Sequence, residues 1–207
     1  MLPHEIEQES FRIIRAEMGE HNFSEDELAV VVRVIHATAD FDFKDIIRFH
    51  PQAIDRGLAA IRQGCIIVTD VRMVEVGIAG AMLTEFGGQL VCDIRHPTVY
   101  KQAQALGLTR STMAMRLNAD NINGGIVAIG NAPTALLEVI RLVRAESVRP
   151  ALIVGVPVGF VNAVESKDEL LTLEVPYLTA VGRKGGSTVA AAMVNALLRL
   201  ARARTEG

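Results

Sequence analysis

The sequence is poor in cysteine: it has only Cys65 and Cys92, and neither belongs to a CxxC pair or to a Cys/His spacing of the zinc type. Both lie within apolar runs. Free cysteines in such runs are usually buried, and structural disulfides are uncommon in the cytosol. We therefore expect reduced core thiols in a cytoplasmic protein, and no metal site.

An excess of charge of either sign is also missing, because 21 Lys and Arg stand against 24 Asp and Glu. Nucleic-acid-binding surfaces normally need a basic excess, so we expect no nucleic-acid partner. No apolar run reaches the roughly 18 residues that cross a bilayer, and the amino terminus is acidic where a secretory signal is basic. The sequence therefore predicts neither membrane insertion nor secretion.

Common nucleotide and hydrolase motifs are absent as well. There is no GxGxxG, no HExxH and no GxSxG. Gly125 and Gly130 have the spacing of a Walker motif, but Asn131 and Ala132 stand where Lys and Ser or Thr are needed. Nucleotide binding and simple hydrolysis therefore have no support in the sequence.

What the chain does contain, after Gly64, is a series of short apolar runs separated by helical stretches. Such runs are typical of strands buried on both faces of a parallel sheet, with helices as crossover connections. We predict an α/β fold, a single doubly wound domain with a mainly parallel five-stranded sheet flanked by helices. The predicted strands are 65–68, 90–94, 126–129, 152–156 and 177–181, and the later helices are 71–76, 98–106, 112–117, 134–144, 163–171 and 188–200.

Three helices are expected before the first strand. A loose helical pattern covers residues 5–18, a capping box at Ser24 and Glu27 opens a helix that ends near His36, and Pro51 opens a third that Gly64 ends. No linker or repeat divides the chain. We therefore expect one domain over residues 1–207, with helices of about 1–63 packed on an α/β core of about 64–205.

Two glycine-bearing turns are candidate ligand sites, because ligands of such folds bind beyond the carboxyl ends of the strands. The amides of the turn at 130–134 suit a carboxylate or phosphate, and a simple tight connection is the alternative. The turn at 182–187 combines Arg183 and Lys184 with flexible glycines. This turn suits carboxylates, or else it is a solvated basic turn.

Among the five histidines, His36 is the candidate acid. It falls at the carboxyl end of a predicted helix, where the helix dipole favours the protonated imidazole and keeps a proton available. The alternative is a charge interaction with the helix end. His50 and His96 precede prolines and are expected in turns, while His4 and His21 are expected to be solvated.

Six segments carry a further signal: 34–40 (VIHATAD), 69–74 (TDVRMV), 109–111 (TRS), 128–136 (AIGNAPTAL), 155–167 (GVPVGFVNAVESK) and 182–187 (GRKGGS). In their order and spacing they closely resemble the precorrin-8X methylmutase family, also called cobalt-precorrin-8 methylmutase. The resemblance spans nearly the whole chain.

The resemblance implies an isomerase of corrin-ring biosynthesis, which moves a methyl group from C-11 to C-12 of precorrin-8X or cobalt-precorrin-8. The product is hydrogenobyrinic or cobyrinic acid. A doubly wound fold, a homodimer with sites near the subunit interface and no cofactor are implied too. His36 corresponds to the family's catalytic histidine, which protonates the macrocycle so that a suprafacial 1,5-shift can follow.

A corrin substrate carries several acetate and propionate side chains, so its site needs distributed anion-binding groups around an apolar slot. We expect Arg110 to act with His36 in catalysis, by stabilising a peripheral carboxylate or charge developing in the ring. The alternatives are a surface salt bridge for Arg110, helix caps for Thr109 and Ser111, and an exposed charge pair for Lys167. The expected substrate-binding residues are Thr109, Ser111, Asn131, Thr134, Lys167, Arg183, Gly185, Gly186 and Ser187.

One departure from the family pattern follows Gly77. The chain continues Ala79-Gly80 where members of the family often carry a polar or basic residue, so a substrate contact is expected to be missing there. Two other functions stay open: a corrinoid-binding carrier without chemistry, and an unrelated α/β enzyme acting on another polyanionic metabolite. The sequence does not distinguish a metal-free from a cobalt-containing substrate.

Overall fold

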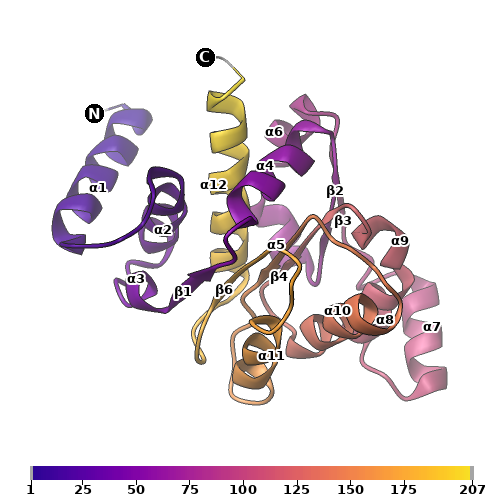
Figure 1. Ribbon diagram of the computed structural model, residues 1–207. Coiled ribbons are helices and arrows are strands. Elements are labelled where there is room, and N and C mark those ends of the chain that lie inside the picture. The colour runs from indigo at the N-terminus through magenta and orange to yellow at the C-terminus, as the bar shows by residue number, and fades with distance from the viewer. Residues whose placement is uncertain (1, 206–207) are drawn as a thin grey trace.

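A six-stranded sheet forms the centre of the molecule in the computed structural model, which describes residues 2–205 (Figure 1). The strand order is β1-β6-β5-β4-β2-β3, and the paired strands are parallel except for β1 with β6. The strands are β1 (Ile47–Phe49), β2 (Ile66–Thr69), β3 (Gln89–Val91), β4 (Ile126–Ile129), β5 (Leu152–Gly155) and β6 (Tyr177–Ala180).

The central strands β4 and β5 are buried along their whole length, as expected for a sheet covered on both faces. Alternate side chains point to opposite faces. Ile126 and Ala128 of β4 join one apolar cluster, whereas Val127 and Ile129 join the other. The sheet therefore separates two hydrophobic cores.

The long helix α12 (Ser187–Ala203) covers one face of the sheet and is contacted by α2 (Glu25–Thr38), α4 (Ala53–Arg62) and α5 (Arg72–Gly77). Buried alanines along α12 allow the neighbouring helices to approach closely. The helix α1 (Pro3–Met18) packs on α2. Two short helices complete this side, α3 (Phe43–Ile46) before β1 and α6 (Gly80–Glu85) before β3.

The opposite face is covered by α10 (Pro133–Ala145), which lies between α8 (Arg110–Leu117) and α11 (Ala163–Leu170) (Figure 1). Buried residues of α10 recur at helical spacing, including Leu136, Val139, Ile140 and Val143. The helix α7 (Pro97–Leu106) packs on α8, and the short α9 (Ala119–Ile122) precedes β4.

The predicted doubly wound, mainly parallel fold is confirmed, but the predicted number of five strands is wrong, because the sheet has six. The missed strand, β1, is three residues long, has the exposed Arg48 at its centre and lies antiparallel at the sheet edge. An edge strand need not be apolar on both faces, so β1 lacks the signal that identified the others. The strand β3 ends at Val91 rather than at residue 94, and the prediction lacks α3, α6 and α9.

Within residues 2–205, no helix has the length and apolar character needed to cross a bilayer. Cys65 and Cys92 are free and half-buried. Burial raises the pKa of the Cys65 thiol to about 11. The two thiols do not form a disulfide with each other. Each is only half-buried, whereas core positions were expected.

Candidate active site at the carboxyl edge of the sheet

The turn after β4 is closed by a buried carboxylate. Asp70, which follows β2, is fully buried and accepts backbone hydrogen bonds from Gly130 (3.1 Å), Asn131 (2.8 Å) and Ala132 (2.7 Å). Burial raises the pKa of Asp70, while these hydrogen bonds act in the opposite direction. The expectation of free amides is therefore wrong for Gly130, Asn131 and Ala132, whereas the Thr134 amide has no acceptor among the described residues.

Gly130 serves a contact between two turns. A Cβ atom on Gly130 would lie 2.6 Å from the Cα atom of Ser187 and 2.9 Å from the carbonyl oxygen of Gly186. Any side chain at position 130 would therefore push apart the turns that follow β4 and β6. The glycine signal in the sequence marks this close approach rather than a ligand contact.

The turn after β6 leads into α12 with its amides partly free. The Gly186 amide donates to the Val156 carbonyl (2.9 Å). This amide was expected to bind a ligand, but it is already occupied. Gly185 has φ +159°, and a Cβ atom there would lie 2.3 Å from the same carbonyl oxygen. By contrast, the amides of Ser187 and Thr188 in the first turn of α12 have no acceptor among the described residues. The helix dipole and these donors favour an anion at this helix start.

Lys167 is fully buried rather than exposed on the side of a helix. It projects from α11, and its ammonium donates to the carbonyl of Lys184 (2.9 Å) in the turn after β6. Burial lowers the pKa of Lys167 to about 8, and the nearby Asp168 acts in the opposite direction. The expectation of an exposed charge pair is wrong, because Lys167 is buried and its ammonium binds the turn after β6 from inside.

The turn after β6 also reaches the segment that follows α2. The Lys184 ammonium binds the carboxylates of Asp40 (2.5 Å) and Asp42 (2.6 Å). His36 lies four residues before Asp40, in the last turn of α2. The ion pairs therefore connect the helix end that carries His36 to the carboxyl edge of the sheet.

His36 itself is exposed and contacts α1 rather than another candidate residue. Its ring meets Phe11 edge to face, with 5.2 Å between centroids. A shallow hollow of about 450 Å³ is lined by His4, Ile6, Glu7 and His36. The imidazole is therefore accessible from outside this chain.

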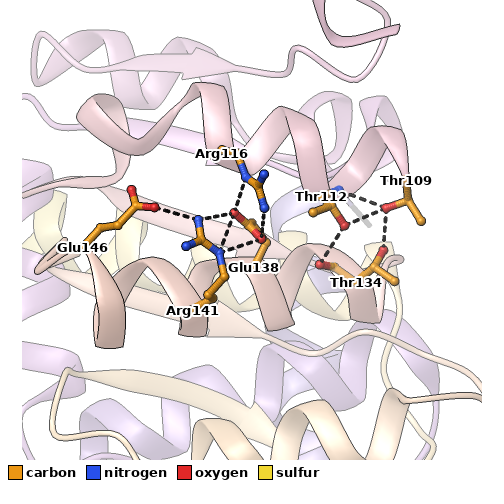
Figure 2. Close-up of polar contacts among 7 residues, drawn as sticks. All are labelled: Thr109, Thr112, Arg116, Thr134, Glu138, Arg141 and Glu146. Carbon is orange, nitrogen blue, oxygen red and sulfur yellow. Dashed lines mark hydrogen bonds and ion pairs between the residues drawn. The ribbon is translucent and has the colours of Figure 1, made fainter. Parts of the chain in front are cut away.

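A group of threonine hydroxyls joins the starts of α8 and α10 (Figure 2). Thr109 caps α8 by accepting from the Thr112 amide (3.1 Å), and its hydroxyl lies 3.0 Å from that of Thr134. The cap that was the alternative reading of Thr109 is therefore present. Arg110 and Ser111 follow this cap, and the exposed Arg110 has no carboxylate partner within the described part of the chain.

The remaining candidates lie along the same edge. The Asn131 side chain is exposed beyond β4, and Arg183 is exposed beside Phe160, with its Cζ atom 5.2 Å from the ring centroid. At Ala79, where a family contact is expected to be missing, the amide donates to Asn195 Oδ1 (2.8 Å) of α12. Across residues 2–205, no group of three or more His, Cys, Asp or Glu side chains is arranged to hold a metal ion.

The fold thus brings the starts of α8, α10 and α12 together. His36 is connected to this edge indirectly, because Asp40 and Asp42, which follow its helix, bind Lys184. Sequence reasoning did not assign roles to Asp70 or to the Lys184 pairs. Asp70 was detectable as a charged residue directly after a buried strand, but its partners lie 60 residues and more away. No local pattern identifies such partners.

Comparisons with known proteins identify the family to which the chain belongs. The family model of precorrin-8X methylmutase matches residues 5–200. The chain is 48% identical to cobalt-precorrin-8 methylmutase from Leptospira interrogans, over 97% of this chain and 95% of that protein. It is 40% identical to precorrin-8X methylmutase from a Sinorhizobium species, over 94% of this chain and 93% of that protein.

Two solved structures of related proteins have the same fold. The crystal structure of precorrin-8X methyl mutase from Thermus thermophilus superposes with a TM-score of 0.89 at 43% identity, covering 96% of this chain and 98% of that one. A precorrin-8X methylmutase related protein gives a TM-score of 0.85 at 33% identity, covering 92% and 100%.

Proposed function

The chain belongs to the precorrin-8X methylmutase family, and from that premise we propose that it moves a methyl group from C-11 to C-12 of precorrin-8X or cobalt-precorrin-8. The products are hydrogenobyrinic and cobyrinic acid, and the step is an isomerisation in cobalamin biosynthesis. The observation that carries the proposal is the match to enzymes of this name over nearly their full length.

His36 is the proton donor of the proposed reaction. It lies in the last turn of α2 and is exposed, so a bound ring can reach its imidazole. Protonation makes the conjugated ring electron-poor. The bond from the methyl carbon to C-11 then breaks as the bond to C-12 forms, and loss of a ring proton restores the charge. Nothing is oxidised or reduced, so this chemistry requires no redox cofactor.

Arg110 is the second catalytic residue that we propose. Its guanidinium is exposed without a carboxylate partner in the described residues, so it can bind a peripheral carboxylate or stabilise charge in the ring. The Thr109 hydroxyl is already engaged by the Thr112 amide and by the hydroxyls of Thr112 and Thr134, so it positions Thr134, which retains capacity for a further hydrogen bond. Ser111 and the exposed Asn131 add polar groups along the same edge.

The start of α12 is the proposed anion site of the second turn. Gly185 and Gly186 allow the backbone to approach the Val156 carbonyl closely. The Ser187 amide that follows has no acceptor among the described residues and is the proposed anion donor. Arg183 adds an exposed cation beside it. Lys167 supports binding indirectly, because it holds the Lys184 carbonyl of this turn.

The enzyme is proposed to act as a cytoplasmic homodimer with its sites near the subunit interface. His36 and the turns at the carboxyl edge lie on open surface of this chain, so a second subunit is suited to close the site over a large ring. The substrate carries either no metal or cobalt, and the experiment below uses both forms.

The test is to incubate the purified protein with precorrin-8X or cobalt-precorrin-8 and to follow the visible spectrum. We expect conversion by the wild type, and a rate lower by about 10²- to 10⁴-fold for His36→Ala, because a general acid is lost. The variant should still bind product. His21→Ala is the matched control, since His21 is exposed and stacks on Phe23 away from these turns.

Each other result has a defined meaning. Conversion by His36→Ala at the wild-type rate would show that His36 is not the proton donor. Binding without conversion by the wild type would identify a corrinoid carrier. No spectral change with either substrate would overturn the proposed function.

A further inference from the structure

The connection between β5 and α11 exposes three apolar side chains at the edge that carries the candidate site. The exposed fractions are 45% for Val158, 82% for Phe160 and 77% for Val161. Large apolar side chains gathered on a surface usually mark a binding site. None of the roles assigned so far uses them.

This connection has a fixed backbone. The Gly159 amide donates to the Arg183 carbonyl (3.3 Å), and the Gly186 amide donates to the Val156 carbonyl (2.9 Å). At its far end, the buried Ala163 begins α11. The apolar side chains are therefore held beside the turn after β6, next to the free amides of α12.

A cation borders this apolar surface. The Arg183 guanidinium lies 5.2 Å from the centroid of the Phe160 ring, and within residues 2–205 it has no carboxylate partner. The neighbouring Lys184 differs, because Asp40 and Asp42 neutralise it. An unneutralised guanidinium stacked at the rim of an apolar surface suits a flat apolar ligand with acidic substituents.

We propose that Phe160, flanked by Val158 and Val161, is the surface on which the substrate macrocycle lies, with Arg183 binding one of its peripheral carboxylates. The inference rests on the proposed function, since a corrin ring supplies both the apolar face and the carboxylates. A second copy of this chain could also cover an apolar patch, but it would leave the Arg183 charge without a partner. The unneutralised cation therefore favours the ring.

The test compares Phe160→Ala and Phe160→Tyr with the wild type in the conversion assay and in binding of cobyrinic acid, followed by its visible spectrum. Phe160→Ala removes a phenyl ring that the bound macrocycle would partly cover. It should raise KM and the Kd for cobyrinic acid about tenfold, with kcat within about twofold of the wild type. Tyrosine should restore both constants, because it keeps the aromatic face. Arg183→Gln should raise the same constants.

Tyr100→Ala is the matched control, because Tyr100 is an exposed aromatic residue on α7 to which no role at the site is assigned. Wild-type KM and Kd in Phe160→Ala would overturn the inference. Conversion of a dimer to a monomer by Phe160→Ala, with the Kd unchanged, would identify the second copy as the occupant instead and would overturn it too.

Failure of the proposed function gives a different result. If the wild type binds cobyrinic acid but converts neither substrate, the enzyme assignment falls, while the Kd of Phe160→Ala still decides whether the ring lies on Phe160. If the wild type does not bind cobyrinic acid at all, both proposals fall.

Discussion

At the residue scale, two buried charged groups organise the carboxyl edge in different ways. Asp70 accepts hydrogen bonds from three backbone amides, which offset part of the cost of burying its carboxylate. Lys167 has a single carbonyl acceptor, on Lys184, and its burial lowers its pKa. Burial raises the pKa of Asp70 and lowers that of Lys167, so it disfavours the charged form of both groups.

The stability of the protein should rise between pH 8 and pH 10.5 through Lys167. Its pKa is about 8 in the folded chain against 10.5 for the free group, so in this window the unfolded chain binds more protons. Lys167→Met should abolish this gain, which is up to about 3 kcal/mol. Urea unfolding of both proteins across this range measures the difference between their free energies of unfolding.

Comparing the two proteins also removes the effect of Cys65. The raised pKa of that thiol, about 11, keeps it protonated in the folded chain and acts in the opposite direction above pH 9 in both proteins. Lys44→Met is the matched control, because Lys44 also donates to a carbonyl, that of Met18, but is only half-buried. If the free energy of unfolding changed with pH equally in Lys167→Met and Lys44→Met, the pH dependence would not arise from the burial of Lys167.

At the element scale, the pair α8 and α10 sets the position of Arg110. Glu138 of α10 is 5% exposed and binds Arg116 of α8 (2.8 Å) and Arg141 of its own helix (2.7 Å). Figure 2 shows this network and the threonine cluster along the same helix pair. The network therefore keeps the start of α8, with Arg110, beside the start of α10.

Glu138→Gln should lower the free energy of unfolding by about 1–2 kcal/mol at pH 7, because two charged hydrogen-bond donors lose their partner. Burial raises the pKa of Glu138, but the hydrogen bonds from Arg141 and Arg116 outweigh it, so the pKa lies below the ordinary value of 4.5. The stabilisation is therefore present above about pH 4.5 and is lost as the pH falls through the folded-state pKa.

Chemical denaturation of the wild type and the variant at pH 7 and pH 3 tests this expectation. Glu146→Gln is the control, since Glu146 also binds Arg141 (2.9 Å) but is 49% exposed and should contribute less than about 0.5 kcal/mol. If both variants lose equal stability, burial of Glu138 does not matter.

The elements also show what sequence reasoning can reach. Continuous apolar runs identified β4 and β5, because a strand buried on both faces leaves a local signal. The edge strand β1 leaves none, since Arg48 faces solvent. At the site, the helix end at His36 and the cap at Thr109 were predictable from local pattern, but the buried position of Lys167 was not. A lysine in a polar helix has no local feature that distinguishes burial from exposure.

At the scale of the whole molecule, three of the candidate residues face outward. The imidazole of His36, the guanidinium of Arg110 and the phenyl ring of Phe160 are all exposed in the single chain. A large ring held on such an open surface would remain in contact with water. Closure of the site therefore requires further protein, which the proposed homodimer would provide.

The active particle should have twice the mass of the chain. Light scattering after size-exclusion chromatography measures that mass, and specific activity on dilution shows whether the dimer is the active form. Activity should fall as dimers dissociate. A monomer with constant specific activity at all concentrations would contradict the dimeric site.

The packing of α2 on α12 also bears on how the chain acquires its structure. Within the described residues α2 precedes every strand of the sheet, whereas α12, which packs on it, follows every strand and is therefore synthesised later. Contacts between such distant parts of a chain slow folding. The helix that carries His36 is therefore secured only after the sheet and α12 have been synthesised, so a nascent chain holds the candidate acid long before it holds a site.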